Sequence, residues 1–155
     1  MRRTLLVGLG LLAVLLLAAC DGLEAEADKK IRNSLTGIWF AVTEEPDEGS
    51  DKTVTVQSWL VLNSDGKFSE KLKGLYPDGR ILDAGSDGEW LVTDDLFKLR
   101  YVTVNGKNLR RHELSTMYAF KIVEVTKDAF TYKDPLEAKS QSLTVKRVTE
   151  IGKEP

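Results

Sequence analysis

The sequence has few of the residues that form disulfides, multi-histidine metal centres and basic binding surfaces. Its 155 residues include one cysteine and one histidine, so a single chain forms neither an internal disulfide nor a metal site with several histidine ligands. Lysine and arginine number 22 against 24 acidic residues, which gives a net charge of −2. Nucleic-acid-binding domains usually carry a concentrated basic patch. We therefore expect no nucleic-acid partner, and the length predicts one ordinary domain.

The first twenty residues combine a basic start with a short apolar run. Arg2 and Arg3 precede an uncharged stretch, residues 5–19, that is rich in leucine, valine and alanine. Such a run is shorter than the roughly 20 residues that a membrane-spanning helix needs. A basic start, a short apolar run and small residues at its end are typical of a secretory signal peptide.

The apolar run ends in Leu17-Ala18-Ala19-Cys20, which resembles the lipobox of bacterial lipoproteins. The resemblance implies cleavage before Cys20, a diacylglyceryl group on its thiol and acylation of the new amino group. An ordinary signal peptide with an accidental cysteine is the alternative. Two or three acyl chains would make release from a membrane negligible, whereas one holds weakly. The resemblance predicts a signal peptide over 1–19, and a lipidated N-terminus, tether and short helix over 20–35.

The predicted location is the bacterial cell envelope, with the protein facing the periplasm on a lipid anchor. Asp21 resembles the inner-membrane retention signal of enteric lipoproteins, but other bacteria read further positions, so the choice of membrane stays open. Cleavage would remove two arginines and no acidic residue, which leaves 20 basic and 24 acidic residues and a net charge of −4. This charge gives the mature protein little attraction to anionic lipid.

From residue 36 onward the pattern changes to short β-rich runs between turn residues. Asp87-Gly88 and Asn105-Gly106 are hairpin signals, and Asn63–Gly66 and Pro77–Gly79 are turn sequences. No window within this region has the apolar stripe of a long helix, so parallel strands with helical crossovers are excluded. We predict strands near 38–44, 52–62, 67–76, 80–92 (interrupted), 96–105, 114–126, 129–134 and 141–148.

Alternation along these strands predicts sheets with one apolar face. Leu60 and Leu62 share a parity, and Phe97 and Leu99 alternate with lysine and arginine. About eight antiparallel strands in a meander avoid free edges when they close into a barrel. The fold prediction is therefore an all-β domain over residues 36–150, a single closed meander, with an open sheet or a sandwich as alternatives. Trp59 has the outward parity, and it either packs on the N-terminal segment or forms an exposed patch.

Residues 28–35 form at most two helical turns, with Asp28 as a possible N-cap. A helix this short is not stable alone. We expect it to dock on the domain through Ile31 and Leu35.

The first strand opens with Thr36-Gly37-Ile38-Trp39, which looks like the Gly-x-Trp signature of lipocalins and related barrels. The resemblance implies that Trp39 closes one barrel end and that a basic residue near the last strand, Arg147 by position, stacks over its ring. It also implies a lipid-, quinone- or fatty-acid-like ligand. Two features depart from the family: Thr93-Asp94-Asp95 matches its middle motif only in part, and no long helix follows the last strand.

The predicted ligand-binding residues are apolar rings with a few polar groups: Trp39, Tyr101, Tyr118, Phe120 and Arg147. The leading hypothesis is a membrane-anchored envelope lipoprotein that binds a small apolar or amphipathic ligand in the barrel. The alternative is a barrel with a packed interior that acts as an interaction module for another envelope protein.

No enzymatic activity is expected. His112 has Glu113 beside it, but neighbouring residues of a strand point to opposite faces, and no nucleophile stands out. The acidic stretch 44–48 lacks the ligand spacing of a calcium loop and is interpreted as a surface loop near the barrel mouth. We therefore predict no catalytic residue, no metal site and no cofactor.

Overall fold

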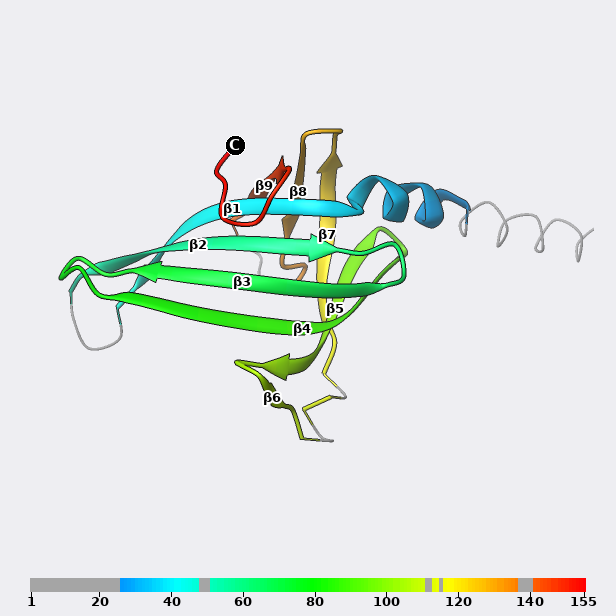
Figure 1. The fold of residues 1–155 in the computed structure, drawn as a ribbon. Coiled ribbons are helices and arrows are strands. Elements are labelled where there is room, and N and C mark those ends of the chain that lie inside the picture. Colours follow the sequence, from blue (N-terminus) through cyan, green and yellow to red (C-terminus); the bar gives the residue numbers. More distant parts are fainter. Residues whose placement is uncertain (1–25, 48–50, 111–112, 115, 137–140) are drawn as a thin grey trace, which may run out of the picture.

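The computed structural model describes residues 26–47, 51–110, 113–114, 116–136 and 141–155. Cys20, the predicted signal peptide and His112 lie outside the described residues. Residues 26–35 are helical, and nine strands follow in the described part of the chain (Figure 1). The strands are β1 (Gly37–Pro46), β2 (Thr53–Leu62), β3 (Lys67–Leu75), β4 (Ile81–Thr93), β5 (Leu96–Val104), β6 (Lys107–Asn108), β7 (Tyr118–Val125), β8 (Ala129–Lys133) and β9 (Leu143–Val148).

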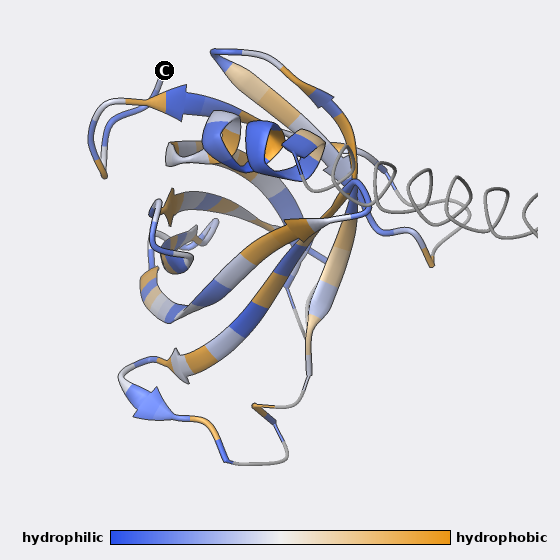
Figure 2. Ribbon diagram, turned by 90° about the vertical axis from the view of Figure 1, so that its right-hand side faces the viewer, coloured by the Kyte–Doolittle hydropathy of each residue, from blue (hydrophilic) through white to orange (hydrophobic). Residues whose placement is uncertain are grey.

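The strands form a closed antiparallel barrel, as the sequence predicts. Their order is β4-β3-β2-β1-β9-β8-β7-β5-β6, and an additional pairing of β4 with β5 closes the ring. The two-residue β6 pairs with β5 alone among the described strands, so eight strands make the barrel. Figure 2 shows these strands curving around a common interior, with hydrophilic and hydrophobic residues alternating along them.

The turns explain most of the predicted boundaries, with one exception. Asn105 and Gly106 both have positive φ, at 50° and 73°, as a tight Asn-Gly hairpin requires. Asp87-Gly88, predicted as a hairpin or a break, instead lies inside the continuous strand β4, so that prediction is wrong. A Cβ on Gly88 would collide with the carbonyl oxygen of Arg100 on β5. This glycine therefore serves close strand approach at a register shift rather than a turn.

One half of the barrel, which we call the closed end, is filled with side chains. Trp39, Phe97, Phe130 and Leu35 are each at most 1% exposed. Phe97 contacts Phe130 with ring centroids 5.8 Å apart, and Trp39 meets Phe130 edge-on at 4.8 Å. Each such side chain contributes on the order of 1.5–3 kcal/mol by leaving water. This cluster is the core of the domain.

The helix over 26–35 covers the closed end. Leu35 is fully buried and Ile31 packs against the same core, so the predicted docking is confirmed. Asp28 is not the predicted cap, because residues 26 and 27 are already helical and its carboxylate accepts a hydrogen bond from the amide of Asp94, 3.3 Å away. Among the described residues, no helix has the length and apolar character needed to cross a bilayer.

Trp59 faces away from the barrel interior, as its parity predicts, but neither proposed role fits. It packs against Phe40 with ring centroids 5.1 Å apart and is only 3% exposed. Its indole N–H donates to the carbonyl oxygen of Lys153, and Gln57 donates to the side chain of Glu154. The C-terminal segment, residues 149–155, thus covers these two rings on the outside of β1 and β2 (Figure 1).

The strands differ in length, which shapes the opposite end of the barrel. Strands β1 to β4 have 9 to 13 residues, whereas β7, β8 and β9 have 5 to 8. The pairing of β1 with β9 covers only Ile38–Phe40. The long strands therefore project beyond the short ones at the end away from the helix (Figure 1), which we call the mouth.

Candidate functional site

Arg147 and Trp39 form the end cap that the Gly-x-Trp resemblance implies. The guanidinium of Arg147 lies 4.1 Å from the centroid of the Trp39 ring. It also donates to the carbonyl oxygens of Ser34 at 2.6 Å, Thr36 at 2.8 Å and Lys127 at 2.7 Å. The Ser34 carbonyl belongs to the last turn of the helix, where carbonyls have no intrahelical partner. Arg147 therefore caps the helix and covers the tryptophan at once.

Gly37 is required by the same arrangement. Its φ is +143°, a backbone conformation that side chains rarely permit, and a Cβ there would collide with the guanidinium of Arg147. The indole N–H of Trp39 donates to the carbonyl oxygen of Leu35 at 2.6 Å. The predicted ligand residues Trp39 and Arg147 thus contact each other, the helix, the core and the carbonyls of Thr36 and Lys127, and their binding role stays a prediction.

The other three predicted residues meet at the mouth. Tyr101 on β5 and Tyr118 and Phe120 on β7 line a hollow of about 480 Å³, together with apolar and polar residues of the strand ends and of the segment between them. Those further residues are Val104, Leu109, Glu113 and Thr116. We call this the mouth hollow. Tyr101 and Tyr118 are in edge contact, with ring centroids 5.6 Å apart. Its volume lies within the range of small-molecule sites, roughly 300–1,000 Å³.

Glu70 does not line the mouth hollow but contacts one of its residues, Tyr101, and it is not among the predicted site residues. It faces the interior from β3, opposite Leu60 on β2 and Ser86 on β4. One carboxylate oxygen, Oε2, accepts a hydrogen bond from Ser86 Oγ at 3.0 Å and a longer one from the Tyr101 hydroxyl at 3.4 Å. Tyr101 therefore links this carboxylate to the hollow.

Burial dominates the acid–base properties of this group. It raises the pKa of Glu70 above its usual value, against the opposing effect of the hydrogen bonds from Ser86 and Tyr101. Burial and then the nearby Glu70 charge raise the pKa of Tyr132 to about 12 and raise that of Tyr101 as well. Partial burial thus disfavours the ionised form of the Glu70 carboxylate unless a hydrogen-bond donor or a cation joins it.

A signal for Glu70 exists in the sequence. Phe68 and Leu72 share its parity, so an alternating strand places this single acid on the inward face. Phe68 is 2% exposed, and its ring meets that of Tyr101 at 5.2 Å. A charged residue at an inward position of an otherwise apolar strand face marks a buried polar site.

A second hollow of about 430 Å³ lies on the concave side of the projecting strands. Its apolar floor comes from β2, β3 and β4, and the lining includes Val54, Val56, Leu72 and Leu82. Arg80 also lines it and is held by Asp78 through an ion pair of 2.6 Å. The mouth therefore has two recesses with apolar walls.

The described residues include no group of three or more His, Cys, Asp or Glu side chains arranged to hold a metal ion. The acidic stretch 44–48 is described up to Asp47, and it lies at the projecting end of β1. Glu44, Glu45, Pro46 and Asp47 are at the rim of the mouth, with Glu45 and Asp47 lining the second hollow.

The strand pairing defines the class of fold, a closed eight-stranded antiparallel barrel capped by one short helix. Among solved structures, the chain is similar to a lipocalin-like protein from Bacteroides uniformis ATCC 8492, with 13% identity and a TM-score of 0.45. That match covers 74% of this chain and 99% of the other. No protein-family model and no curated protein matches the sequence. The fold assignment rests on the pairing of the chain's own strands.

Proposed function

We propose that the protein is a non-enzymatic, lipid-anchored binding protein of the bacterial envelope that holds a small amphipathic ligand at the barrel mouth. The observation that carries the proposal is the mouth hollow, about 480 Å³ lined by three aromatic rings, one of which, Tyr101, donates to the half-buried carboxylate of Glu70. Apolar walls with a few polar groups are the usual construction of a small-molecule site. The apolar part of the ligand packs on Tyr101, Tyr118 and Phe120, and its polar end meets hydroxyl and carboxylate oxygens.

The anchoring part of the proposal rests on Leu17-Ala18-Ala19-Cys20. Lipidation of Cys20 would attach the chain to a membrane ahead of the helix that begins by residue 26. A Cys20→Ser variant expressed in a bacterium with a lipoprotein pathway should move from the membrane fraction to the soluble fraction, and it should no longer incorporate labelled palmitate. Unchanged membrane retention of the variant would contradict the anchor.

The ligand part is tested with the neutral fluorescent probe N-phenyl-1-naphthylamine and purified protein. Binding should raise its emission. Val104→Trp, at the wall of the mouth hollow, should weaken the affinity for the probe at least about tenfold, which corresponds to 1.4 kcal/mol of binding free energy. The control is Val123→Trp, because Val123 is 53% exposed on β7 and does not line the hollow. Equal binding by both variants, or no binding by the wild type, would refute the site.

The alternative is an interaction module that recognises another envelope protein. The packed closed end favours this alternative, because the side chains of Trp39, Phe97 and Phe130 fill that half of the barrel. Under this alternative, purified protein carries no lipid in native mass spectrometry. Site-specific photocrosslinking from the rim residue Glu45 would then capture one defined protein.

A further inference from the structure

We propose that the mouth hollow selects amphipathic ligands with a cationic or hydrogen-bond-donating polar end, and discriminates against anionic, fatty-acid-like molecules. This inference deepens the proposed function and rests on it. The resemblance to lipocalins alone leaves fatty-acid-like ligands open, so the selectivity comes from the polar groups that this chain places around its hollow.

The polar groups in and behind the hollow present acceptors. A phenol has a single proton to donate, and that of Tyr101 is directed to Glu70 Oε2. The Tyr101 oxygen therefore has only lone pairs left to offer a ligand. Glu113 in the wall is a carboxylate, and one of its oxygens accepts the backbone N–H of Arg110 at 2.6 Å. The hydroxyls of Thr116 and Tyr118 can turn to donate or accept.

The Glu70 carboxylate can still accept a hydrogen bond from a ligand. Both of its hydrogen bonds end on Oε2, and within the described part of the chain Oε1 takes none. Among those residues no buried side-chain oxygen or nitrogen lacks a partner, so Oε1 retains access to solvent. The acceptors for a ligand ammonium or hydroxyl are then the oxygen of Tyr101, a residue that lines the hollow, and the Glu70 carboxylate to which it is hydrogen-bonded.

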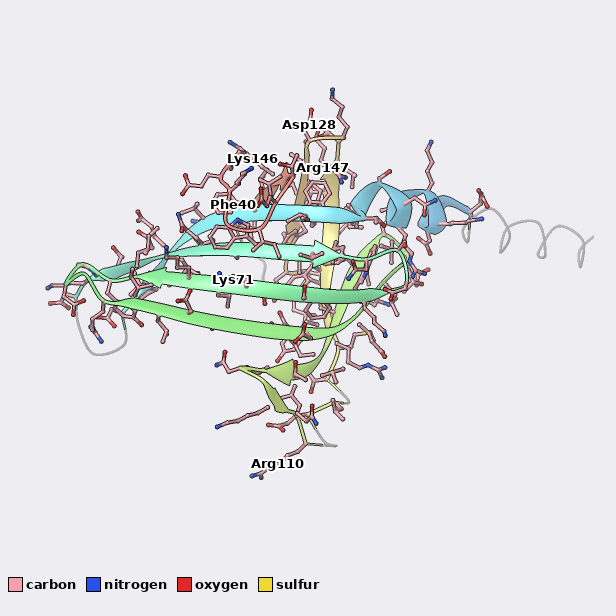
Figure 3. The ribbon with its side chains drawn as sticks, viewed as in Figure 1. Phe40, Lys71, Arg110, Asp128, Lys146 and Arg147 are labelled. Carbon is pink, nitrogen blue, oxygen red and sulfur yellow. The ribbon has the colours of Figure 1, made fainter. Side chains whose placement is uncertain are left out.

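Cations that would recognise a ligand carboxylate are absent from the lining that the structure describes. None of the residues placed around the mouth hollow is lysine or arginine. Arg110 lies beyond the hollow with its guanidinium directed away from the barrel (Figure 3). Arg100 on β5 is held by Glu89, and Arg80 by Asp78. A carboxylate ligand would therefore face Glu113 and Glu70 with no described counter-charge in the wall.

The aromatic rings of the mouth hollow also favour a cationic ligand over an anionic one. Tyr101, Tyr118 and Phe120 supply faces and edges around one space. Aromatic faces attract cations, and the attraction grows when water is excluded. A carboxylate gains nothing equivalent from the negative face of a ring. An alkylammonium ion satisfies the ring faces, the Tyr101 oxygen and the carboxylate together, while its chain covers the apolar wall of Val104 and Leu109.

The test measures displacement of N-phenyl-1-naphthylamine from the purified protein by dodecylamine, dodecanol and dodecanoate, which share one chain and differ at the polar end. We expect dodecylamine to compete at least tenfold more tightly than dodecanoate, with dodecanol between them. Glu70→Gln should weaken dodecylamine severalfold and leave dodecanol unchanged. The matched control is Glu124→Gln, an exposed carboxylate on β7, which should leave all three affinities unchanged.

The outcomes separate this inference from the proposed function. Equal affinities for the three competitors, or tightest binding of dodecanoate, would overturn the selectivity while leaving the hollow as a ligand site. Failure of the neutral probe itself to bind would overturn the site and the selectivity together. The wild-type comparison needs no variant. Glu70→Gln keeps an acceptor for Ser86 and Tyr101, and its circular dichroism and melting temperature report whether it folds.

Discussion

Replacing Arg147 by lysine should destabilise the protein although the charge is kept. The guanidinium donates to the carbonyl oxygens of Ser34, Thr36 and Lys127 and covers the ring of Trp39. A lysine ammonium is a point charge that reaches one or two of these groups, since it lacks the planar fork of arginine.

The expected loss follows from these contacts. Hydrogen bonds to a charged donor are worth about 1.5–3 kcal/mol each. The bonds to Ser34 and Lys127 lie in exposed surroundings, so water replaces them at small cost, whereas the bond to Thr36 is partly buried. With a weakened cation–π contact, worth about 0.5–2 kcal/mol, Arg147→Lys should lower the free energy of unfolding by about 2–3 kcal/mol.

Urea unfolding followed by tryptophan fluorescence measures this change. A loss of this size lowers the midpoint by about 0.7–3 M, because small domains unfold with slopes of roughly 1–3 kcal/mol per M. The control is Arg100→Lys, since Arg100 makes an exposed ion pair with Glu89 and such pairs are worth about 0–1 kcal/mol. If Arg147→Lys unfolds at the same urea concentration as this control, the end cap has no energetic importance and the reasoning fails.

Three further changes test other parts of the structure. Gly37→Ala should lower the free energy of unfolding by about 2 kcal/mol or more, since φ is +143° and the methyl group meets Arg147. In urea unfolding, the same substitution should cost less in an Arg147→Leu background, and an equal cost in both backgrounds would count against the clash. Deleting residues 149–155 should expose Trp59, which is 3% exposed, so its emission should shift to the red and become accessible to iodide while the β-sheet signal in circular dichroism persists. Tyr132, with a pKa of about 12 against an ordinary 10.0, contributes stability that is complete below pH 10 and is lost as the pH rises toward 12. Tyr132→Phe should therefore flatten the fall in unfolding free energy across that interval, and an unchanged slope would show that another group titrates.

The strand arrangement can be predicted from the sequence because each strand has its own alternation of apolar and polar residues and its own turn residues. Alternation placed Leu60 and Leu62 inside and Trp59 outside, and Asn105-Gly106 forms the tight hairpin that its residues favour. Closure followed from the edge argument, and the pairing of β4 with β5 confirms it. Local chemistry of this kind repeats along the chain and so can be interpreted without coordinates.

The errors occurred where a distant segment decides a residue's role. Gly88 looks like a turn glycine, but the approach of the Arg100 carbonyl explains it. Asp28 looks like an N-cap, but its carboxylate accepts a hydrogen bond from the backbone N–H of Asp94, 66 positions away. Trp59 is covered by the C-terminal segment, residues 149–155, whose sequence has no apolar pattern that predicts this contact. A single sequence does not show which of two plausible partners a side chain will have.

The candidate site divides in the same way. Tyr101, Tyr118 and Phe120 were chosen as inward rings, and the structure brings them together at one hollow. Trp39 and Arg147, predicted to bind the same ligand, lie at the opposite end, where the Gly-x-Trp resemblance itself puts the tryptophan. Glu70 shares the inward parity of Phe68, but its charge alone favours the solvent face, so the sequence does not single it out.

The hydrogen bond from Arg147 to the Thr36 carbonyl joins residues 111 positions apart, and the pairing of β1 with β9 joins the beginning of the barrel to its end. Neither contact can form until nearly the whole chain is available. Closure of the barrel therefore comes last, although neighbouring strands such as β1 and β2 can pair before it. A chain that emerges gradually from a ribosome would leave one edge of β1 unpaired until its last strand is released.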